Sequence, residues 1–586
     1  MMPQVLMSSV ALAALVQLLP LKGLLAWVLL LPLLAGFLIL LLPAHSVGAH
    51  RVLALTATVA TLLLSLRLWA GFEAWAVEPF QQIVGFTAEW SGLVWIRLEF
   101  GLDGLNLWMV LLTAVLMPLA VLCSWITQQA HSQAFMALLL VLETALLAAF
   151  TCLDILGFYV LYESALLPMF LLIGLGGSRP RKVRAAYLLV LYTLVGSLAM
   201  LPCILLMMSQ AGTTSLELLL HEEWQPARQL VLWWGLFLAF AVKVPMMPVH
   251  LWLPEAHVEA STAGSVLLAG VLLKLGTYGF LRFQLPLFPD ACVYYGPFVI
   301  TLSLLGIVYA SLTTLRQVDL KKIVAYSSVA HMNVVVLAVF ALSDLGAQAA
   351  AFLMLAHGVA SPAMFLGVGT LYDRTHTKAL KYLGGAATAM PLWSMMFFIF
   401  SLANMALPMT PNFIAEFLCL CSIFAHNGWA LFGACLGVIL SAVYTLWAYA
   451  RVVHGMPKPQ FFKALTDLNR RETWTFIPLL LILIWWGIKP GLVLDQLSPG
   501  LWYWNQVNFG SLGVDSWILE VNQAIAQSFQ KNHSFFFFVI IILHSFLHQI
   551  EDQIRFIVYG NLCSCTSTCN CGASVVGCSL LDFGRT

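Results

Sequence analysis

The sequence predicts an all-α integral membrane protein with about fourteen transmembrane helices. Of its 586 residues, 61% are hydrophobic and 9% are charged, whereas about a quarter of the residues in soluble domains are charged. Apolar runs of about 20 residues, the length that a helix needs to cross the hydrocarbon core, recur along the chain. The formal net charge of +1 gives no reason to expect a nucleic acid partner.

The apolar segments divide the chain into three parts. We predict an N-terminal apolar segment at 1–22, a transmembrane core at 23–493 and a C-terminal extension at 494–586 without an assigned function. The fourteen predicted core segments lie near 23–43, 51–71, 104–126, 134–152, 153–175, 185–208, 229–253, 258–281, 291–312, 322–343, 346–371, 388–424, 430–450 and 473–493. Five cysteines crowd the end of the extension, but their spacing lacks the C-x2-C pairs typical of zinc or iron–sulfur sites, so we predict no metal there.

Lys and Arg residues gather in the loops that follow odd-numbered segments. All of these loops must lie on one side of the membrane, and the bias of short loops assigns that side to the cytoplasm or the mitochondrial matrix. The alternation supports the segment count, since one missed helix would scramble it. The basic residues of these loops are Arg179, Arg181, Lys182, Arg184, Arg316, Lys321, Lys322, Arg374, Lys378, Lys381, Arg451, Lys458, Lys463, Arg470 and Arg471.

Four ionisable residues fall inside the predicted helices, far from either membrane surface. They are Glu163 in segment five, Lys243 in segment seven, Lys274 in segment eight and Glu416 in segment twelve. Glu163 lies about 15 Å along its helix, near the midplane. A charge at that depth costs several kcal/mol, which makes each such residue a candidate for function. Snorkelling to the interface is possible for Lys274 and Glu416 but is the second choice there, and Glu163 and Lys243 are too deep for it.

Two histidines, His331 in segment ten and His357 in segment eleven, lie at a similar depth. A buried neutral histidine often only joins two helices by a hydrogen bond, and each of these alone would be interpreted that way. Together with the buried acids and amines they suggest a proton path. Burial disfavours the charged form of amines and carboxylic acids, so both can gain and release protons with little driving force.

Prolines accompany the buried charges in segments seven and twelve. Pro245 and Pro248 follow Lys243, and Pro408 and Pro411 precede Glu416. Because proline breaks a helix, and lipid tolerates a break only where it is covered by protein or water, these positions predict a cavity. A matching pair of interrupted helices is typical of transporters built from two inverted repeats.

Several motifs resemble one family closely. They are AFAVKVPMMPVHLWLPEAHVEASTAGSVLLAGVLLKLGTY (239–278), FGLDGLNLW (100–108), SLTTLRQVDLKKIVAYSSVAHMN (311–333), LYDRTHT (371–377) and TPNFIAEF (410–417). The resemblance covers about 23–493 and is to the proton-translocating, antiporter-like chain 4 family of NADH–ubiquinone oxidoreductase (respiratory complex I), with plant-type mitochondrial versions nearest. Bacterial equivalents and multisubunit sodium/proton antiporters are more distantly similar.

The resemblance implies two inverted five-helix repeats and a proton path through Glu163, Lys243, Lys274, His331, His357 and Glu416. It also implies a multi-pass position in the mitochondrial inner membrane, beside lipids and other membrane-arm subunits, including sister antiporter-like chains. No cofactor is expected in this chain, and FMN, iron–sulfur clusters and ubiquinone are expected in partner subunits. Three positions depart from the family pattern and put local geometry in question: Met409 in place of Gly, Ser261 in place of Pro, and Ser361-Pro362 in place of a Ser-Ser-like pair.

Three other functions remain open from the residues alone. The first is a subunit of a cation/proton antiporter with the same fold. The second is a redox protein with His331 and His357 as axial haem ligands, although Lys and Glu at the same depth fit a haem badly. The third is a structural scaffold, which the four buried charges argue against.

Overall fold

The computed structural model describes residues 23–76, 79–90, 94–126, 131–177, 179–222, 224–456 and 466–509. The predicted segment 1–22 and the cysteine-rich end of the chain lie outside the described residues. The first half contains α2 (Leu24–Leu41), α3 (Val47–Ala70), β1 (Gln81–Trp90), β2 (Val94–Leu102), α4 (Gly104–Cys123), α5 (Ser132–Thr151), α6 (Ile155–Ser164), α7 (Leu166–Gly176), α8 (Lys182–Leu198), α9 (Met200–Ala211), α10 (Leu216–Leu220), α11 (Pro226–Lys243) and α12 (Trp252–Glu259). The second half contains α13 (Thr262–Leu267), η1 (Leu268–Leu272), α14 (Leu273–Gly279), η2 (Phe280–Gln284), α15 (Leu285–Leu287), α16 (Pro289–Arg316), α17 (Leu320–Val339), α18 (Asp344–Thr375), η3 (Leu380–Tyr382), α19 (Ala386–Ala389), α20 (Pro391–Asn404), α21 (Pro411–His426), α22 (Gly428–Val453), α23 (Arg470–Ile488) and α24 (Gly491–Phe509).

The fourteen predicted segments all correspond to helical elements. Among the described residues, 12 helical stretches are long and apolar enough to span a membrane. The other two segments cross as broken pairs, α11 with α12 and α20 with α21. The predicted fold class, including the breaks in helices seven and twelve, is therefore confirmed.

Helices seven and twelve are five segments apart, and this spacing has a structural consequence. Consecutive segments cross the membrane in opposite directions, so two segments separated by an odd number also run in opposite directions. The break after α11 (244–251) and the break after α20 (405–410) therefore occur in oppositely directed chains. This is the arrangement expected of inverted repeats.

Segments five and six also contain interruptions, and the sequence analysis did not predict these. Helix α6 ends at Ser164 and α7 begins at Leu166, with one turn residue between them. Pro168 explains the interruption, because it has no N–H to donate to the carbonyl of Ser164 one turn earlier. In the same way, Pro202 cannot donate to the carbonyl of Leu198, the last residue of α8, so the helix is interrupted before α9. Glu163 therefore lies next to a break, as Lys243 does.

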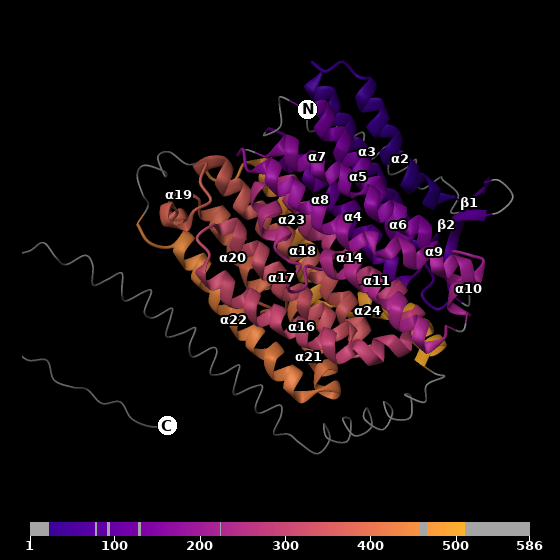
Figure 1. The fold of residues 1–586 in the computed structure, drawn as a ribbon. Helices are drawn as coiled ribbons and strands as arrows, with labels where there is room; N and C mark the ends of the chain where they lie inside the picture. Colours follow the sequence, from indigo (N-terminus) through magenta and orange to yellow (C-terminus); the bar gives the residue numbers. More distant parts are fainter. Residues whose placement is uncertain are drawn as a thin grey trace, which may run out of the picture. The chain divides into compact units, whose positions relative to one another are not determined.

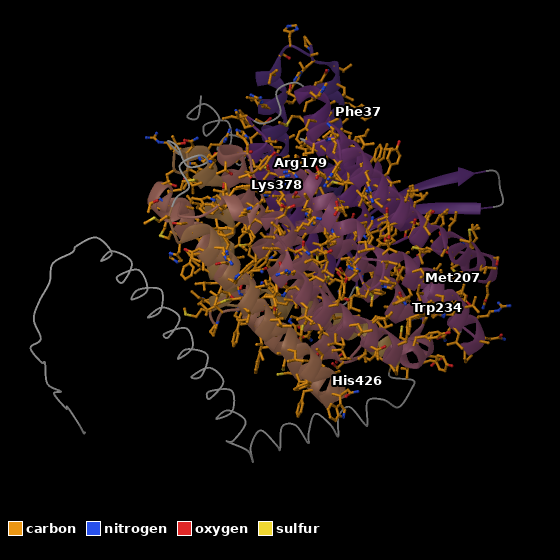
Figure 2. The ribbon with its side chains drawn as sticks, turned by 60° about the vertical axis from the view of Figure 1, so that its left-hand side comes forward. Phe37, Arg179, Met207, Trp234, Lys378 and His426 are labelled. Carbon is orange, nitrogen blue, oxygen red and sulfur yellow. The ribbon has the colours of Figure 1, made fainter. Side chains whose placement is uncertain are left out.

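The basic loops do share one side, since they are joined by hydrogen bonds. Asp319 forms a β-bridge with Ala379, and the Gly385 N–H donates to the carbonyl of His454 at 3.0 Å. Arg374 reaches Glu472 at 2.6 Å. Figure 2 shows Arg179 and Lys378 close together, on the side of the bundle away from His426.

The opposite loops are joined to each other in the same way. The Leu153 N–H donates to the carbonyl of Glu99 at 2.8 Å, and the Ile155 N–H donates to Thr214 at 3.1 Å. These contacts connect the loops that follow segments two, four and six. The alternation predicted from the Lys and Arg residues is thus present in the fold.

Two elements appear where the sequence analysis predicted only a connection or a tail. Strands β1 and β2 form an antiparallel hairpin in the long loop before α4, and this hairpin projects from the bundle in Figure 1. Helix α24 continues past the core boundary predicted at 493 and packs against α4 and α18. Its backbone approaches Gly104 so closely that a Cβ there would clash with the Gln496 carbonyl, which ties α24 to the core.

The most buried helices lie in the middle of the bundle. Helix α18 and the stretch Thr262–Leu287 are buried along their whole spanning windows, whereas α2, α16 and α22 keep an exposed apolar face. Figure 1 shows α14, α17 and α18 between the N-terminal helices and the orange α20–α22 group. Three of the predicted site residues, Lys274, His331 and His357, are carried by these central helices.

A buried ion pair fixes the start of α4. Arg282 Nη1 donates to Asp103 Oδ2, and these side chains are 1% and 2% exposed. The other oxygen of Asp103 accepts the Asn106 N–H at 2.9 Å and caps α4. One carboxylate therefore joins segment eight to segment three and also begins the helix.

We expect Asp103→Asn to destabilise the protein because the amide can keep the cap but cannot pair with the Arg282 charge. Breaking a buried ion pair from one side costs about 3–5 kcal/mol. Asp103→Ala should cost about 1 kcal/mol more, because it also removes the cap. Thermal unfolding of the chain in its purified assembly measures both variants. Wild-type stability in Asp103→Asn would show that the cap alone matters.

Candidate functional site

Lys243 is the last residue of α11 and is held by an aromatic side chain. Its exposed fraction is 2%, and its Nζ lies 3.9 Å from the centre of the Tyr162 ring. Nζ also donates to the Tyr162 carbonyl at 3.3 Å. The Tyr162 hydroxyl in turn donates to Ala239 of α11 at 2.9 Å, so α6 and α11 are fixed together at this lysine.

Glu163 follows Tyr162 and interacts with Lys243 through its charge. The carboxylate and the ammonium are close enough to stabilise each other, although none of the direct ion pairs among the described residues joins them. Its Oε1 is buried, while the flanking Val160 and Leu167 are 57% and 67% exposed. Glu163 and Lys243 thus interact through their charges without a direct ion pair, and Glu163 lies near the edge of the bundle.

Lys274 and His357 are in direct contact. Lys274 Nζ lies 2.9 Å from His357 Nδ1, and both side chains are fully buried. Nζ also donates to the carbonyl of Ala269, five residues earlier, within the π-helical turn η1. π-Helical turns are frequent at functional sites.

His331 and Glu416 form the next contact. His331 Nδ1 lies 2.8 Å from Glu416 Oε1, and both side chains are 5% exposed. The ring centres of His331 and His357 are 5.7 Å apart. Residues from α14, α18, α17 and α21 therefore form a continuous series from Lys274 to Glu416, which we call the buried polar chain.

Glycines let the helices of this chain approach one another. Gly270 in η1 and Gly358 in α18 face each other, and a Cβ on Gly358 would lie 3.2 Å from the Gly270 carbonyl. This contact sets the separation of Lys274 and His357. A Cβ on Gly276 would lie 2.9 Å from the Cβ of Lys243, so α14 also packs directly on the end of α11.

The structure shows the local setting of the three departures from the family pattern. Met409 has φ 73°, a left-handed conformation that favours glycine. The Ser261 hydroxyl accepts the Gly264 N–H at 3.3 Å and caps α13. The Ser361 hydroxyl lies 3.1 Å from that of Ser328, which joins α18 to α17 beside the two histidines.

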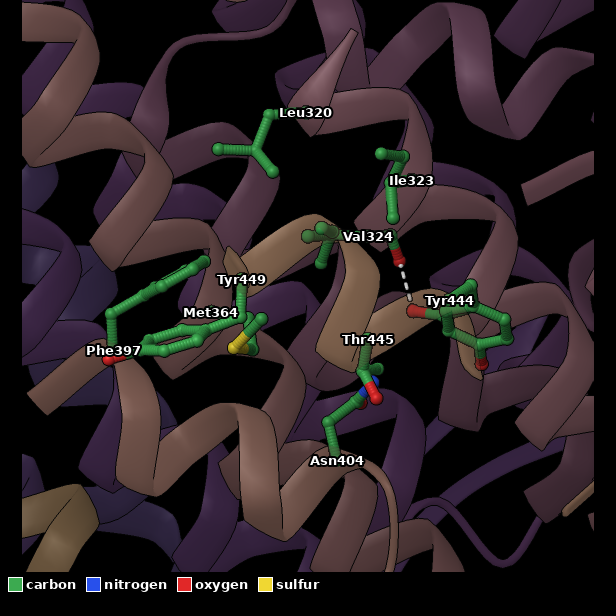
Figure 3. A pocket seen from close by; sticks show the side chains of 11 residues that line it. Leu320, Ile323, Val324, Met364, Phe397, Asn404, Tyr444, Thr445 and Tyr449 are labelled. Atoms are coloured by element: carbon green, nitrogen blue, oxygen red, sulfur yellow. Dashed lines mark hydrogen bonds between the residues drawn. The ribbon is translucent and has the colours of Figure 1, made fainter. Parts of the chain in front are cut away.

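A small pocket lies beside the buried polar chain, at the break in helix twelve. Figure 3 shows Leu320 at one end and Asn404 at the other, with Tyr444 at the side. Asn404 is the last residue of α20 before the break. Tyr444 is buried and interacts with Glu416. The remaining lining residues include Ser327, whose hydroxyl donates to the Val324 carbonyl at 2.8 Å.

Several buried polar residues were missed by the sequence analysis. His257 is fully buried and stacked on Phe365 with ring centres 4.4 Å apart. Lys321, assigned to a basic loop, is 3% exposed and donates to Ala260 at 3.0 Å. Glu143 is fully buried in α5. Its position in the middle of an apolar segment is the signal that identified Glu163, and it would have identified Glu143 as well.

The structure thus brings the six predicted residues into two groups. Lys274, His357, His331 and Glu416 form the buried polar chain, and Glu163 and Lys243 form a second group. The helices that carry Lys243 and Lys274 are in contact through Gly276. Acids, amines and imidazoles in such proximity can pass protons between them.

Known proteins share this fold and sequence. A family described as NADH:quinone oxidoreductase/Mrp antiporter, TM, matches residues 152–442. NADH-ubiquinone oxidoreductase chain 4 of Arabidopsis thaliana is 48% identical over 477 residues, which are 81% of this chain and 96% of the relative. Chain 4 of Marchantia polymorpha has the same identity and coverage.

Solved structures agree with the sequence relatives. A chain of respiratory complex I from Thermus thermophilus with bound NADH is 31% identical with TM-score 0.74, over 82% of this chain and 99% of that one. A chain of the Mrp complex from Dietzia sp. DQ12-45-1b has TM-score 0.72 and 18% identity, over 82% and 97%, and shows the same fold. From its sequence identity to curated relatives over nearly their whole length, the chain belongs to the NADH-ubiquinone oxidoreductase chain 4 family.

Proposed function

We propose that this chain is a membrane-arm subunit of an NADH:ubiquinone oxidoreductase and moves protons through Glu163, Lys243, Lys274, His357, His331 and Glu416. The observation that carries the path is the run of contacts from Lys274 to Glu416 through two histidines. The family relationship supports the coupling to NADH oxidation.

Glu163 and Lys243 deliver protons to the buried polar chain. While Glu163 is charged and near, it stabilises the ammonium of Lys243. Moving or neutralising that carboxylate leaves a positive charge in a site that is 2% exposed, and the cost of burying it drives a proton from Lys243 towards Lys274. The helices that carry the two lysines are in contact at Gly276, and water between the two amines would complete the transfer.

The second group carries the proton onward. Lys274, protonated by Lys243, passes the proton to His357. His357 passes it to His331, whose ring centre lies 5.7 Å from its own. His331 passes it to the Glu416 carboxylate, 2.8 Å away. Glu416 lies beyond the broken helix, next to Tyr444, and releases the proton to the opposite side.

Partner subunits supply the redox chemistry and the energy. Each proton moved against the potential costs about 2.3 kcal/mol per 100 mV, so FMN, iron–sulfur clusters and ubiquinone in partner subunits drive this chain. The likeness to a chain of respiratory complex I supports neighbouring membrane-arm subunits, including sister antiporter-like chains. The plant mitochondrial relatives support a place in the mitochondrial inner membrane.

A cation/proton antiporter subunit is the second candidate. The likeness to the Mrp complex supports that fold but not that activity, because the identity is 18%. A requirement for sodium in transport by the purified assembly would favour this candidate. Proton transport that depends on NADH and not on sodium would favour the first.

Lys243→Ala and Glu163→Gln should each abolish or strongly reduce coupled proton pumping. The first removes the amine and the second removes the charge that stabilises it. Assembly should be largely intact, because α6 and α11 are also joined by Tyr162. Proton uptake into vesicles during NADH oxidation measures the effect, and near-normal pumping in both variants would reject this path.

Glu416→Ala should block proton release, because His331 then has no carboxylate beside it. Glu416→Lys should be tolerated in part, since an amine also exchanges protons. The same pumping assay compares the two variants, with the amount of assembled complex as the control. An equal loss in both would indicate that the step needs a carboxylate.

A further inference from the structure

Glu143 is a buried acid that the proposed path does not use. It lies in the middle of α5 with an exposed fraction of 0%, at the depth that singled out Glu163. Its Oε1 lies 2.6 Å from the hydroxyl oxygen of Thr61 on α3. Its other oxygen, Oε2, is buried and has no hydrogen-bond partner in the described part of the chain.

The hydroxyl of Thr61 has two oxygen neighbours but only one hydrogen. One neighbour is Glu143 Oε1, and the other is the carbonyl of Thr58, at 2.9 Å. The carbonyl can only accept a hydrogen bond. If Thr61 donates to Thr58, then the hydrogen between Thr61 and Glu143 must come from Glu143.

The surroundings of Glu143 are apolar and provide no compensating charge. None of the ion pairs found among the described residues involves it. Thr58 and Ser65, the other hydroxyl residues on this stretch of α3, donate to their own helix. A carboxylate here would have one hydroxyl as its whole solvation, whereas an isolated buried charge normally neutralises.

We propose that Glu143 is a proton-binding site outside the conducting path, a neutral carboxylic acid that keeps its proton and donates a hydrogen bond to the Thr61 hydroxyl. Two hydrogen bonds result, from Glu143 to the Thr61 hydroxyl and from that hydroxyl to the Thr58 carbonyl. The first of them joins α5 to α3. The hairpin of α2 and α3 is thereby held on the core by a hydrogen bond that requires a bound proton.

Glu143 and Glu163 therefore have opposite roles at similar depth. Glu163 interacts with the charge of Lys243, and the proposed path uses it as a carboxylate. Glu143 has only a hydroxyl neighbour, and we propose that it keeps its proton. An amide has nearly the shape of a protonated carboxyl group and also donates a hydrogen bond. The substitution to glutamine therefore distinguishes the two residues.

The experiment compares Glu143→Gln with Glu163→Gln in the whole complex, by infrared spectroscopy in H2O and D2O and by NADH-driven proton pumping. The wild-type spectrum should contain the carbonyl stretch of a protonated carboxylic acid, a band that shifts in D2O, and Glu143→Gln should lose this band. Proton pumping by Glu143→Gln should stay within twofold of the wild-type rate. Loss of a carboxylate stretch instead, or pumping as low as in Glu163→Gln, would overturn the proposal.

Thr61→Val provides a second test that leaves Glu143 unchanged. Valine has the shape of threonine but cannot accept a hydrogen bond. The carbonyl band of Glu143 should therefore remain, because the acid keeps its proton, and should shift in frequency, because its hydrogen bond is lost. An unchanged band would show that Glu143 does not donate to Thr61. If this variant fails to assemble, the glutamine comparison alone decides the proposal.

Discussion

An ionisable side chain at bilayer depth must find its partner within the protein, since lipid offers none. Most of the features of this molecule that bear on function follow from that constraint. Lys274 contacts a histidine, Glu416 contacts another, and Lys243 lies on an aromatic ring and a carbonyl. The contacts that lower the cost of burial also place the groups within reach of proton exchange, so stability and transport depend on the same geometry.

Interrupted helices provide further partners by exposing backbone dipoles at the right places. Lys243 is the final residue of α11, and the carboxyl end of a helix favours positive charge. Glu416 is the sixth residue of α21, beyond the first turn in which the helix dipole favours negative charge. The break in segment seven therefore gives Lys243 a favourable helix end, whereas Glu416 depends on its contact with His331.

The number of spanning segments, their sidedness and the two broken helices could be predicted from the sequence, because apolar length, basic loops and proline each act locally. Helix α24 could not, since it forms by packing against the distant helices α4 and α18. The hairpin β1–β2 was also missed, although its strands are close in the sequence and pair with each other. For the site, depth identified the six residues, but not their pairing. That pairing depends on close approaches at Gly270, Gly276 and Gly358, whose partners a single sequence does not reveal. Glu143 and His257 were missed although the same depth criterion applies to them.

The hydrogen bonds between the basic loops also affect how the protein fits its bilayer. The ends of α17, α18, α22 and α23 are joined there by Asp319 with Ala379, Gly385 with His454, and Arg374 with Glu472. A single helix relieves a mismatch with membrane thickness by tilting on its own. Helices tied at their ends cannot do so separately. In a thinner or thicker membrane, the lipid around this chain must therefore stretch or compress to match the protein.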